Sequence, residues 1–249
     1  IRKLLRDSLF SEYYVLECAD GVHGLEVATS QIPDLIISDI MMPGIDGLEL
    51  CEKVKLDDRT SHIPVILLTA KAAHVHQLAG IKTGADLYMT KPFSLELLAL
   101  NIKNLIATRN LIRQKFGQII TLEPTHVTID APDQAFLGKI MNYIEGQLAN
   151  PDFNVPMLSG EMGMSQPILY KKIRALTDLS VNDFIKSVRL KKAAQLLNQQ
   201  VYNVSETAYA VGFSDPKYFT KEFKKQFGLA PTDYVKRKKE DPDEQNAPE

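Results

Sequence analysis

The chain has 249 residues, of which 45% are hydrophobic, and its formal net charge at pH 7 is −2. This length suits two globular domains of roughly 100 to 150 residues each. The sequence contains no apolar run of about 18 residues and opens on no charged-then-apolar leader, so we expect no membrane span, no secretory signal and a cytoplasmic setting. The two cysteines, Cys18 and Cys51, are expected to be buried thiols and not a disulfide.

Charge is distributed unevenly along the sequence. Residues 1–154 carry 14 lysines and arginines against 19 acidic residues, residues 155–239 carry 15 against 7, and residues 240–249 carry none against 5. A basic back half suggests that this part alone meets a polyanion. A solvated, lysine-rich surface would give the same charge, so charge alone leaves both interpretations open. Residues 240–249 are expected to form a disordered acidic tail.

The front half alternates between strand-like and helical patterns. Short β-rich runs are expected to form strands at 13–18, 34–39, 63–69 and 85–90. Amphipathic segments are expected to form helices near 21–30, 46–57, 72–82 and 94–113. This alternation predicts an α/β fold, a doubly wound parallel sheet covered by helices on both faces. Ligands of such sheets bind at the carboxyl ends of the strands.

Three polar residues, Asp39, Thr69 and Lys91, fall at or just beyond the ends of three of these strands. The fold would bring them to one crevice, where an aspartate can accept a phosphoryl group and a hydroxyl and an ammonium can hold the added oxygens. The alternative is structural: Asp39 caps a turn and forms an ion pair with Lys91. The position of all three residues at strand ends favours the phosphoacceptor interpretation.

The segments around these residues, "SDIMMPGIDG", "LLTA" and "YMTKPF", together resemble the receiver domain of response regulators. The resemblance implies that Asp39 is phosphorylated and that Thr69 and Lys91 contact the phosphoryl oxygens. It also implies that Tyr88 is an aromatic switch that reorients with Thr69, and that the bond between Lys91 and Pro92 is cis.

The sequence departs from the receiver family at its start. The family's first strand, with the acidic pair that holds Mg²⁺, would lie upstream of Ile1, so we expect the chain to be the C-terminal piece of a longer protein with a truncated receiver. Only Asp39 and, by family analogy, the carbonyl of Met41 remain as Mg²⁺ ligands. Because Mg²⁺ prefers octahedral oxygen coordination, we expect the ion in a complete receiver and weak or absent binding and phosphorylation in this chain.

The pattern changes after the receiver, which we place at residues 1–112. Residues 113–149 are expected to form a linker and a connecting helix, in which 134–148 carries Phe136, Ile140, Tyr143 and Ile144 on one stripe. From there to residue 239 only helices are expected, so an all-α domain at 150–239 follows.

This all-α region contains an internal repeat. "GMSQPILYKKI" (163–173) resembles "GFSDPKYFTKEF" (212–223), with the glycines 49 residues apart, whereas Phe184 and Tyr234 are 50 apart. Each copy reads as a short helix, a glycine turn and a basic helix, which is the layout of a helix-turn-helix motif. Ser165 and Ser214 stand where N-caps belong, and Pro167 and Pro216 fall in the first turn.

Each basic helix has an outward and an inward face. The side chains expected to reach a DNA groove are Gln166, Tyr170, Lys171 and Arg174 in the first copy and Lys217, Thr220, Lys221 and Lys224 in the second. The side chains expected to face inward are Ile173, Leu176, Phe219, Phe223 and Phe227. Some of the lysines are expected to contact phosphates, which fix the register without reading sequence.

Residues 150–238, with "LSGEMGMSQPILYKKIRALT" and "AYAVGFSDPKYFTKEFKKQFGLAPTDY", resemble the AraC-type DNA-binding domain. The resemblance implies seven helices and two recognition helices in successive major-groove turns. It places DNA contacts at Gln166, Pro167, Tyr170, Lys171, Pro216, Lys217, Thr220 and Lys221. The two prolines offer at most apolar contact with a thymine methyl.

A receiver followed by an AraC-type domain resembles the C-terminal end of hybrid two-component regulators of Bacteroidetes type, in which a histidine kinase is fused upstream. The resemblance implies a transcription regulator controlled by aspartyl phosphorylation, with double-stranded DNA and a histidine kinase as partners. It also implies a homodimer formed through receiver residues near 72–82, 86–89 and 94–107. We expect no enzymatic activity and no membrane contact of this chain itself.

Two rival functions remain open. A phosphatase-like enzyme would also use an aspartyl nucleophile, although Met41 stands where such enzymes have a second acid. A phosphorylation-independent DNA-binding regulator would use the receiver only as a dimerisation scaffold, and the absent acidic pair favours that interpretation for this chain.

Overall fold

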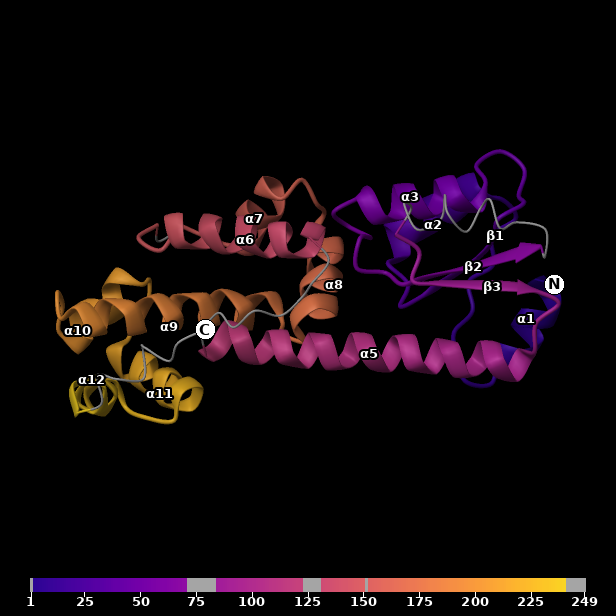
Figure 1. Ribbon diagram of the computed structural model, residues 1–249. Coiled ribbons are helices and arrows are strands. Elements are labelled where there is room, and N and C mark those ends of the chain that lie inside the picture. Colours follow the sequence, from indigo (N-terminus) through magenta and orange to yellow (C-terminus); the bar gives the residue numbers. More distant parts are fainter. Residues whose placement is uncertain (1, 71–83, 123–130, 151, 241–249) are drawn as a thin grey trace. The chain divides into compact units, whose positions relative to one another are not determined.

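The computed structural model describes residues 2–70, 84–122, 131–150 and 152–240. The chain divides into two compact units, residues 1–113 with 130–133 and residues 114–129 with 134–249 (Figure 1). Within the described ranges, no helix combines the length and hydropathy that a membrane span requires.

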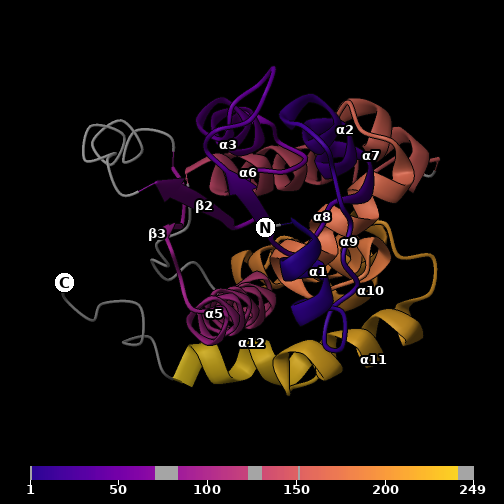
Figure 2. The same ribbon diagram turned by 90° about the vertical axis from the view of Figure 1, so that its right-hand side faces the viewer.

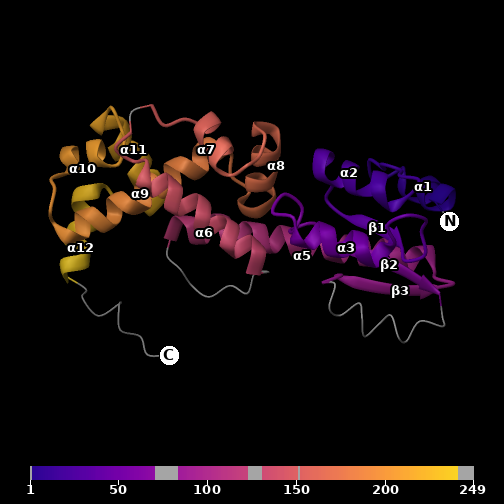
Figure 3. The same cartoon turned by 90° about the horizontal axis from the view of Figure 1, so that it is seen from above.

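The first unit is built on a three-stranded parallel sheet with the order β1-β2-β3. Its strands are β1 (Ile36–Asp39), β2 (Val65–Ala70) and β3 (Leu87–Lys91), which lie side by side in Figure 3. These strands confirm the predictions for 34–39, 63–69 and 85–90. Because parallel strands end at the same edge, their carboxyl ends meet at one side of the sheet.

Four described helices accompany the sheet: α1 (Arg2–Leu9), α2 (Gly21–Gln31), α3 (Gly47–Leu56) and α5 (Leu95–Leu122). Asp20 caps α2 by accepting a hydrogen bond from the amide of His23, and Asp46 caps α3 through the amide of Glu49. The helices predicted at 21–30, 46–57 and 94–113 are confirmed, although α5 continues to Leu122. The helix predicted at 72–82 lies outside the described residues.

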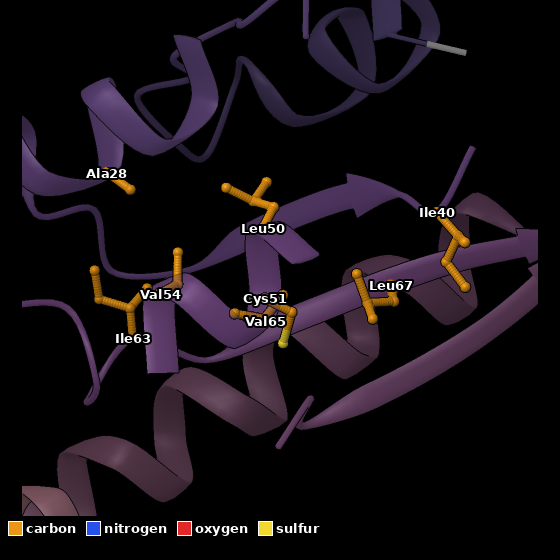
Figure 4. Close-up of a cluster of buried hydrophobic side chains, with 8 residues drawn as sticks. All are labelled: Ala28, Ile40, Leu50, Cys51, Val54, Ile63, Val65 and Leu67. Atoms are coloured by element: carbon orange, nitrogen blue, oxygen red, sulfur yellow. The ribbon is translucent and has the colours of Figure 1, made fainter. Parts of the chain in front are cut away.

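The two faces of the sheet are covered by different helices, as the doubly wound fold predicts. Val65 and Leu67 of β2 pack against Leu50, Cys51 and Val54 of α3 and Ala28 of α2 (Figure 4). The alternate residues Ile66 and Leu68 pack against Leu98 and Ile102 of α5, with partly buried leucines of α1 beside them. Figure 2 shows α3 and α5 on opposite sides of β2. The two-residue period of the strand thus divides the core into two layers.

The strand predicted at 13–18 is not formed, and this prediction is wrong. A β-strand needs a neighbouring strand for its ladder of hydrogen bonds, and none of the described strands pairs with this segment. Tyr14 is 92% exposed as a result. The β-rich composition of this segment indicates only a local preference for extended backbone, and the described sheet does not include the segment.

The second unit is helical throughout its described part. Its helices are α7 (Val155–Glu161), α8 (Gln166–Thr177), α9 (Val181–Gln199), α10 (Val204–Ala210), α11 (Pro216–Phe227) and α12 (Pro231–Glu240), and α6 (Ala131–Gly146) leads into them. The long helix α9 contacts α8, α10, α11 and α12. In Figure 1, α8 lies near one end of α9 and α10 near the other.

The aromatic residues of α11 form the core around this helix. Phe219 and Phe223 are fully buried. The ring centroid of Phe223 lies 4.5 Å from that of Phe227 and 5.4 Å from that of Tyr234. In the first copy Ile173 and Leu176 are buried as well. The predicted inward faces are therefore confirmed, with Phe227 half-buried at the margin.

Candidate functional site

Asp39 ends β1, and its carboxylate contacts two groups at the carboxyl edge of the sheet. Its Oδ2 forms an ion pair with Nζ of Lys91, the last residue of β3. Its Oδ1 accepts a hydrogen bond from the backbone amide of Met41 at 3.2 Å. The Asp39 side chain is 33% exposed.

The turn after Asp39 depends on a close approach of backbone to backbone. A Cβ atom on Gly47 would lie 2.2 Å from the carbonyl oxygen of Asp39, far inside van der Waals contact. The amide of Gly47 donates to the carbonyl of Ile40 at 3.0 Å. Gly47 therefore lets the first turn of α3 pack directly on the residue that bears the candidate phosphoacceptor.

Thr69 and Tyr88 lie on the strands beside Asp39. Thr69 is 8% exposed, and its hydroxyl donates to the carbonyl of Ala70 at 3.2 Å. Tyr88 packs partly buried against the cluster of α2, α3 and β2 that contains Ile40. The Lys91–Pro92 bond is cis, as predicted. The structure thus brings Asp39 and Lys91 into contact and leaves the Thr69 hydroxyl on a backbone carbonyl.

The donor atoms at this edge do not by themselves suit a magnesium ion. Asp39 offers one carboxylate, one oxygen of which is held by the Lys91 ammonium. Across the described ranges, no three residues among histidine, cysteine, aspartate and glutamate gather at a point where they could hold a metal. Because Mg²⁺ takes six oxygen ligands in octahedral geometry, one paired carboxylate and a carbonyl make an incomplete cage.

Helix α8 presents the first predicted DNA surface. Its N-cap is Ser165, as predicted, although the hydroxyl makes no capping hydrogen bond. The five predicted contact residues are all exposed: Gln166, Pro167, Tyr170, Lys171 and Arg174. They form one continuous outer face, because Leu169, Ile173 and Leu176 are buried on the opposite face.

Helix α11 presents the second surface. Lys217, Lys221 and Lys224 are exposed, whereas Pro216 and Thr220 are half-buried. The Thr220 hydroxyl donates to the carbonyl of Pro216 at 2.8 Å.

The N-cap of α11 is Asp215, so the assignment of the cap to Ser214 is wrong. Its carboxylate accepts from the amide of Lys217 at 2.8 Å. Both residues can cap a helix, and the residue before a proline is biased toward an extended backbone, which is also the conformation of an N-cap. Asp215 precedes Pro216 and has φ −127° and ψ 112°.

Comparison with known proteins shows to which families the two parts of the chain belong. The family model "Response regulator receiver domain" matches residues 1–103, and the model "Helix-turn-helix domain" matches residues 158–237. The chain is a receiver domain followed by an AraC-type helix-turn-helix domain. Both predicted resemblances are confirmed.

Individual relatives share parts of this arrangement. Histidine kinase P4 of Formosa agariphila is 40% identical over 237 residues, which cover 95% of this chain and 17% of that protein. The DNA-binding dual master transcriptional regulator RpaA of Synechocystis is 33% identical over 129 residues, 51% of this chain and 54% of RpaA. The signal receiver domain of a histidine kinase from Syntrophus aciditrophicus has 28% identity and a TM-score of 0.41, covering 52% of this chain and 89% of that one. The chain therefore spans only part of the curated relatives it matches.

Two buried charged residues in the helix-turn-helix domain were not predicted from the sequence. Lys172 of α8 has no exposed surface, and its ammonium lies 5.3 Å from the ring centroid of Phe136 in α6. Glu222 of α11 is 8% exposed and forms an ion pair with Lys186 of α9 at 2.9 Å. Helical spacing explains this burial: each charged residue comes three positions after one buried hydrophobic residue and one position before the next, so it lies on the buried face.

Lys186 joins helices α9 and α11. Its ammonium contacts Asp183 at 3.0 Å and Glu222 at 2.9 Å. Burial would lower the pKa of Lys186, but the hydrogen bonds that its ammonium donates to Glu222 and Asp183 outweigh burial and raise it. Hydrogen bonds from Ser180 and Lys186 lower the pKa of Asp183. The Lys186–Glu222 ion pair thus links α9 to α11.

Arg189 of α9 holds the turn of the second helix-turn-helix. Its guanidinium donates to the carbonyl of Gly212 at 3.0 Å and lies 5.9 Å from the ring centroid of Phe153. Burial lowers the pKa of Arg189. Gly212 has φ +82°, and a Cβ there would lie 2.7 Å from the carbonyl oxygen of Leu148, so only glycine fits this turn.

Proposed function

We propose that this chain is the output end of a two-component phosphorelay, a DNA-binding transcription regulator controlled by phosphorylation of Asp39. The observation that carries the proposal is the accessible Asp39 carboxylate beside Lys91 at the carboxyl edge of the receiver sheet, on the same chain as two exposed basic recognition helices. Receiver and helix-turn-helix domains together support a regulator that is not itself an enzyme.

Phosphorylation at this edge is a displacement at phosphorus. An Asp39 oxygen attacks the phosphorus of a phosphohistidine on the kinase, a new O–P bond forms, and the N–P bond to histidine breaks. The Lys91 ammonium is placed to neutralise the incoming charge, because it already contacts Asp39. The Thr69 hydroxyl would exchange its bond with the Ala70 carbonyl for a phosphoryl oxygen, and Tyr88 would follow as the switch.

Magnesium belongs to the complete receiver in this proposal. It would neutralise charge on the phosphoryl group, and the resemblance to receivers implies an acidic pair among its ligands. For the chain as it stands we propose weak or absent Mg²⁺ binding, since Asp39 and the Met41 carbonyl are the ligands left.

We propose a histidine kinase as the phosphodonor, fused upstream in a hybrid protein of Bacteroidetes type. The similarity over 95% of this chain to a protein named histidine kinase P4 supports this arrangement. A homodimer formed through the receiver is part of the same proposal. Its predicted surface includes 72–82, which lies outside the described residues, together with β3 and the first part of α5.

Domain limits follow from the same interpretation. We propose a receiver at 1–112, a linker and connecting helix at 113–149, a DNA-binding domain at 150–239 and an acidic tail at 240–249. The change from the first compact unit to the second after Arg113, and the matched range 158–237, support these limits.

The second candidate is a DNA-binding regulator that uses its receiver only as a dimerisation scaffold. The incomplete magnesium cage at Asp39 favours it for this chain. Phos-tag electrophoresis after treatment with acetyl phosphate and Mg²⁺ separates the two functions.

We would apply this test to the chain and to its upstream-extended parent. We expect a retarded band in the parent, absent in Asp39→Asn and retained in Asp34→Asn. If the parent accepts no phosphoryl group, the phosphorelay proposal is wrong and the receiver is a dimerisation scaffold.

A further inference from the structure

The two helix-turn-helix copies are related by two different offsets. The first helices, α7 and α10, have 7 residues each and start at Val155 and Val204, which are 49 residues apart. The second helices, α8 and α11, have 12 residues each and start at Gln166 and Pro216, which are 50 apart. The extra residue of the second copy therefore lies in the turn, between Gly212 and Asp215.

Burial and capping support the offset of 50 along the recognition helices. Buried residues coincide at this offset: Leu169 with Phe219, Lys172 with Glu222, and Ile173 with Phe223. Both helices also end in a left-handed C-cap, at Asp178 with φ 61° and at Gly228 with φ 76°. Pairing Pro167 with Pro216 instead would set the buried Leu169 against Tyr218, which is 47% exposed.

This register pairs the outward residues of the two helices. The pairs are Gln166 with Pro216, Pro167 with Lys217, Tyr170 with Thr220, Lys171 with Lys221, and Arg174 with Lys224. The two later pairs keep a cation on both helices. The three earlier pairs differ in chemistry, and where one helix carries a proline the other carries a side chain that can donate hydrogen bonds.

The position of a residue along the recognition helix determines which part of the DNA it can contact. In a helix-turn-helix motif the N-terminal residues of the recognition helix contact base edges, and contacts to phosphates carry no sequence information. Glutamine pairs with adenine through N6 and N7, and lysine pairs with guanine through O6 and N7. Proline offers no side-chain hydrogen bond, so each helix has one hydrogen-bonding reader in its first two positions.

We propose that the two recognition helices read unlike half-sites, with Gln166 of α8 selecting adenine and Lys217 of α11 selecting guanine. This inference rests on the proposed DNA-binding function. Lys171, Arg174, Lys221 and Lys224 bind the phosphates of both half-sites and set the register. Tyr170 and Thr220 add contacts that differ between the half-sites.

Selection from a random double-stranded DNA library, carried out with the full chain and its variants, tests the proposal. The variants are Gln166→Ala and Lys217→Ala, with Lys171→Ala and Lys221→Ala as matched controls on the same exposed faces. We expect the wild type to enrich two unlike half-sites. Gln166→Ala should lose about tenfold to a hundredfold discrimination at one adenine, and Lys217→Ala a similar amount at one guanine in the other half-site.

The controls should weaken binding to all sequences and leave the base preferences unchanged. Two identical half-sites, or base preferences that survive both Gln166→Ala and Lys217→Ala, would overturn the inference while the chain still binds DNA selectively. A wild-type chain that enriches no sequence would overturn the proposed function, and this inference with it.

Discussion

Asp39 and Lys91 come from strands that are not neighbours, because β2 lies between β1 and β3. Their ion pair therefore spans the central strand at its carboxyl end. A charge added to Asp39 changes a contact that reaches across the sheet, which is the kind of local electrostatic change that can bias a switch.

The tight approach of Gly47 to Asp39 predicts a large effect of a single methyl group. Gly47→Ala would place a Cβ 2.2 Å from the Asp39 carbonyl oxygen, so the turn must shift. We expect a loss of about 2 kcal/mol or more in the free energy of unfolding, measured by urea denaturation.

Gly24→Ala is the matched control, because its Cβ would meet only a Leu50 methyl at 3.6 Å inside α2. It should be neutral or stabilise the chain by up to about 1 kcal/mol. Equal effects of the two variants would contradict this account of the turn.

The lowered pKa of Asp183 predicts a pH-dependent contribution to stability. Hydrogen bonds from Ser180 and then Lys186 favour the ionised carboxylate in the folded state. This stability is fully present above the unfolded pKa and is lost as the pH falls through the lower folded pKa. Asp183→Asn should lower the free energy of unfolding at neutral pH by less than about 1 kcal/mol, since the side chain is 52% exposed.

The difference between Asp183→Asn and wild type in urea denaturation should shrink as the pH falls below the unfolded pKa of about 3.9, and vanish once the pH is below the lowered pKa of the folded state. A difference that stays constant from neutral to acidic pH would mean that the carboxylate charge plays no part.

Sequence spacing could reveal the buried charges, but only with the helix registers known. Lys172 stands beside Lys171 in a basic run, and composition gives no reason to bury one and expose the other. Lys172, and not Lys171, lies on the buried face of α8 that Leu169 and Ile173 define. The partner, Phe136, belongs to another helix and cannot be inferred from local pattern.

At the scale of elements, the ion pair between Lys186 of α9 and Glu222 of α11 predicts that the two residues contribute unequally to stability. Lys186→Met would leave the buried Glu222 carboxylate without its cation, whereas Glu222→Gln would leave Lys186 with Asp183. We therefore expect Lys186→Met to cost about 2 kcal/mol and Glu222→Gln about 1 kcal/mol in urea denaturation.

The double variant of Lys186 and Glu222 should cost less than the sum of the single variants, because the two groups interact directly. Additive losses would show that the pair does not join the helices.

Helix positions and the three strands of the sheet followed from periodicity, but two local features did not. The segment 13–18 has a strand-like composition, yet strand formation needs a partner that the described sheet does not supply. The N-cap of α11 is Asp215 and not Ser214: Asp215 is extended before Pro216. In the other copy Gln166, before Pro167, is already helical, so the sequence alone does not fix which residue is the cap. The cap at Asp215 places the extra residue of the second repeat in its turn.

At the scale of the whole chain, the receiver and the helix-turn-helix domain differ in the sign of their charge. The receiver part carries an acidic excess, and residues 155–239 carry 15 basic against 7 acidic residues. Charge alone left a solvated surface as an equal alternative. The structure exposes Lys171, Arg174, Lys217, Lys221 and Lys224 on the outer faces of α8 and α11, which favours a polyanion partner.

The salt dependence of DNA binding tests the DNA-binding half of the proposed function most directly. We would measure Kd for DNA selected by the wild-type chain across a salt series, for the wild type and for Lys171→Ala combined with Lys221→Ala. Lys3→Ala combined with Lys53→Ala removes the same charge from exposed receiver residues outside the proposed dimer surface and is the control. We predict binding that weakens with salt, and a logarithmic slope smaller by about 2 only in the helix variant. Binding that ignores salt, or equal slopes in all three proteins, would contradict the assignment of α8 and α11 as a DNA-binding surface.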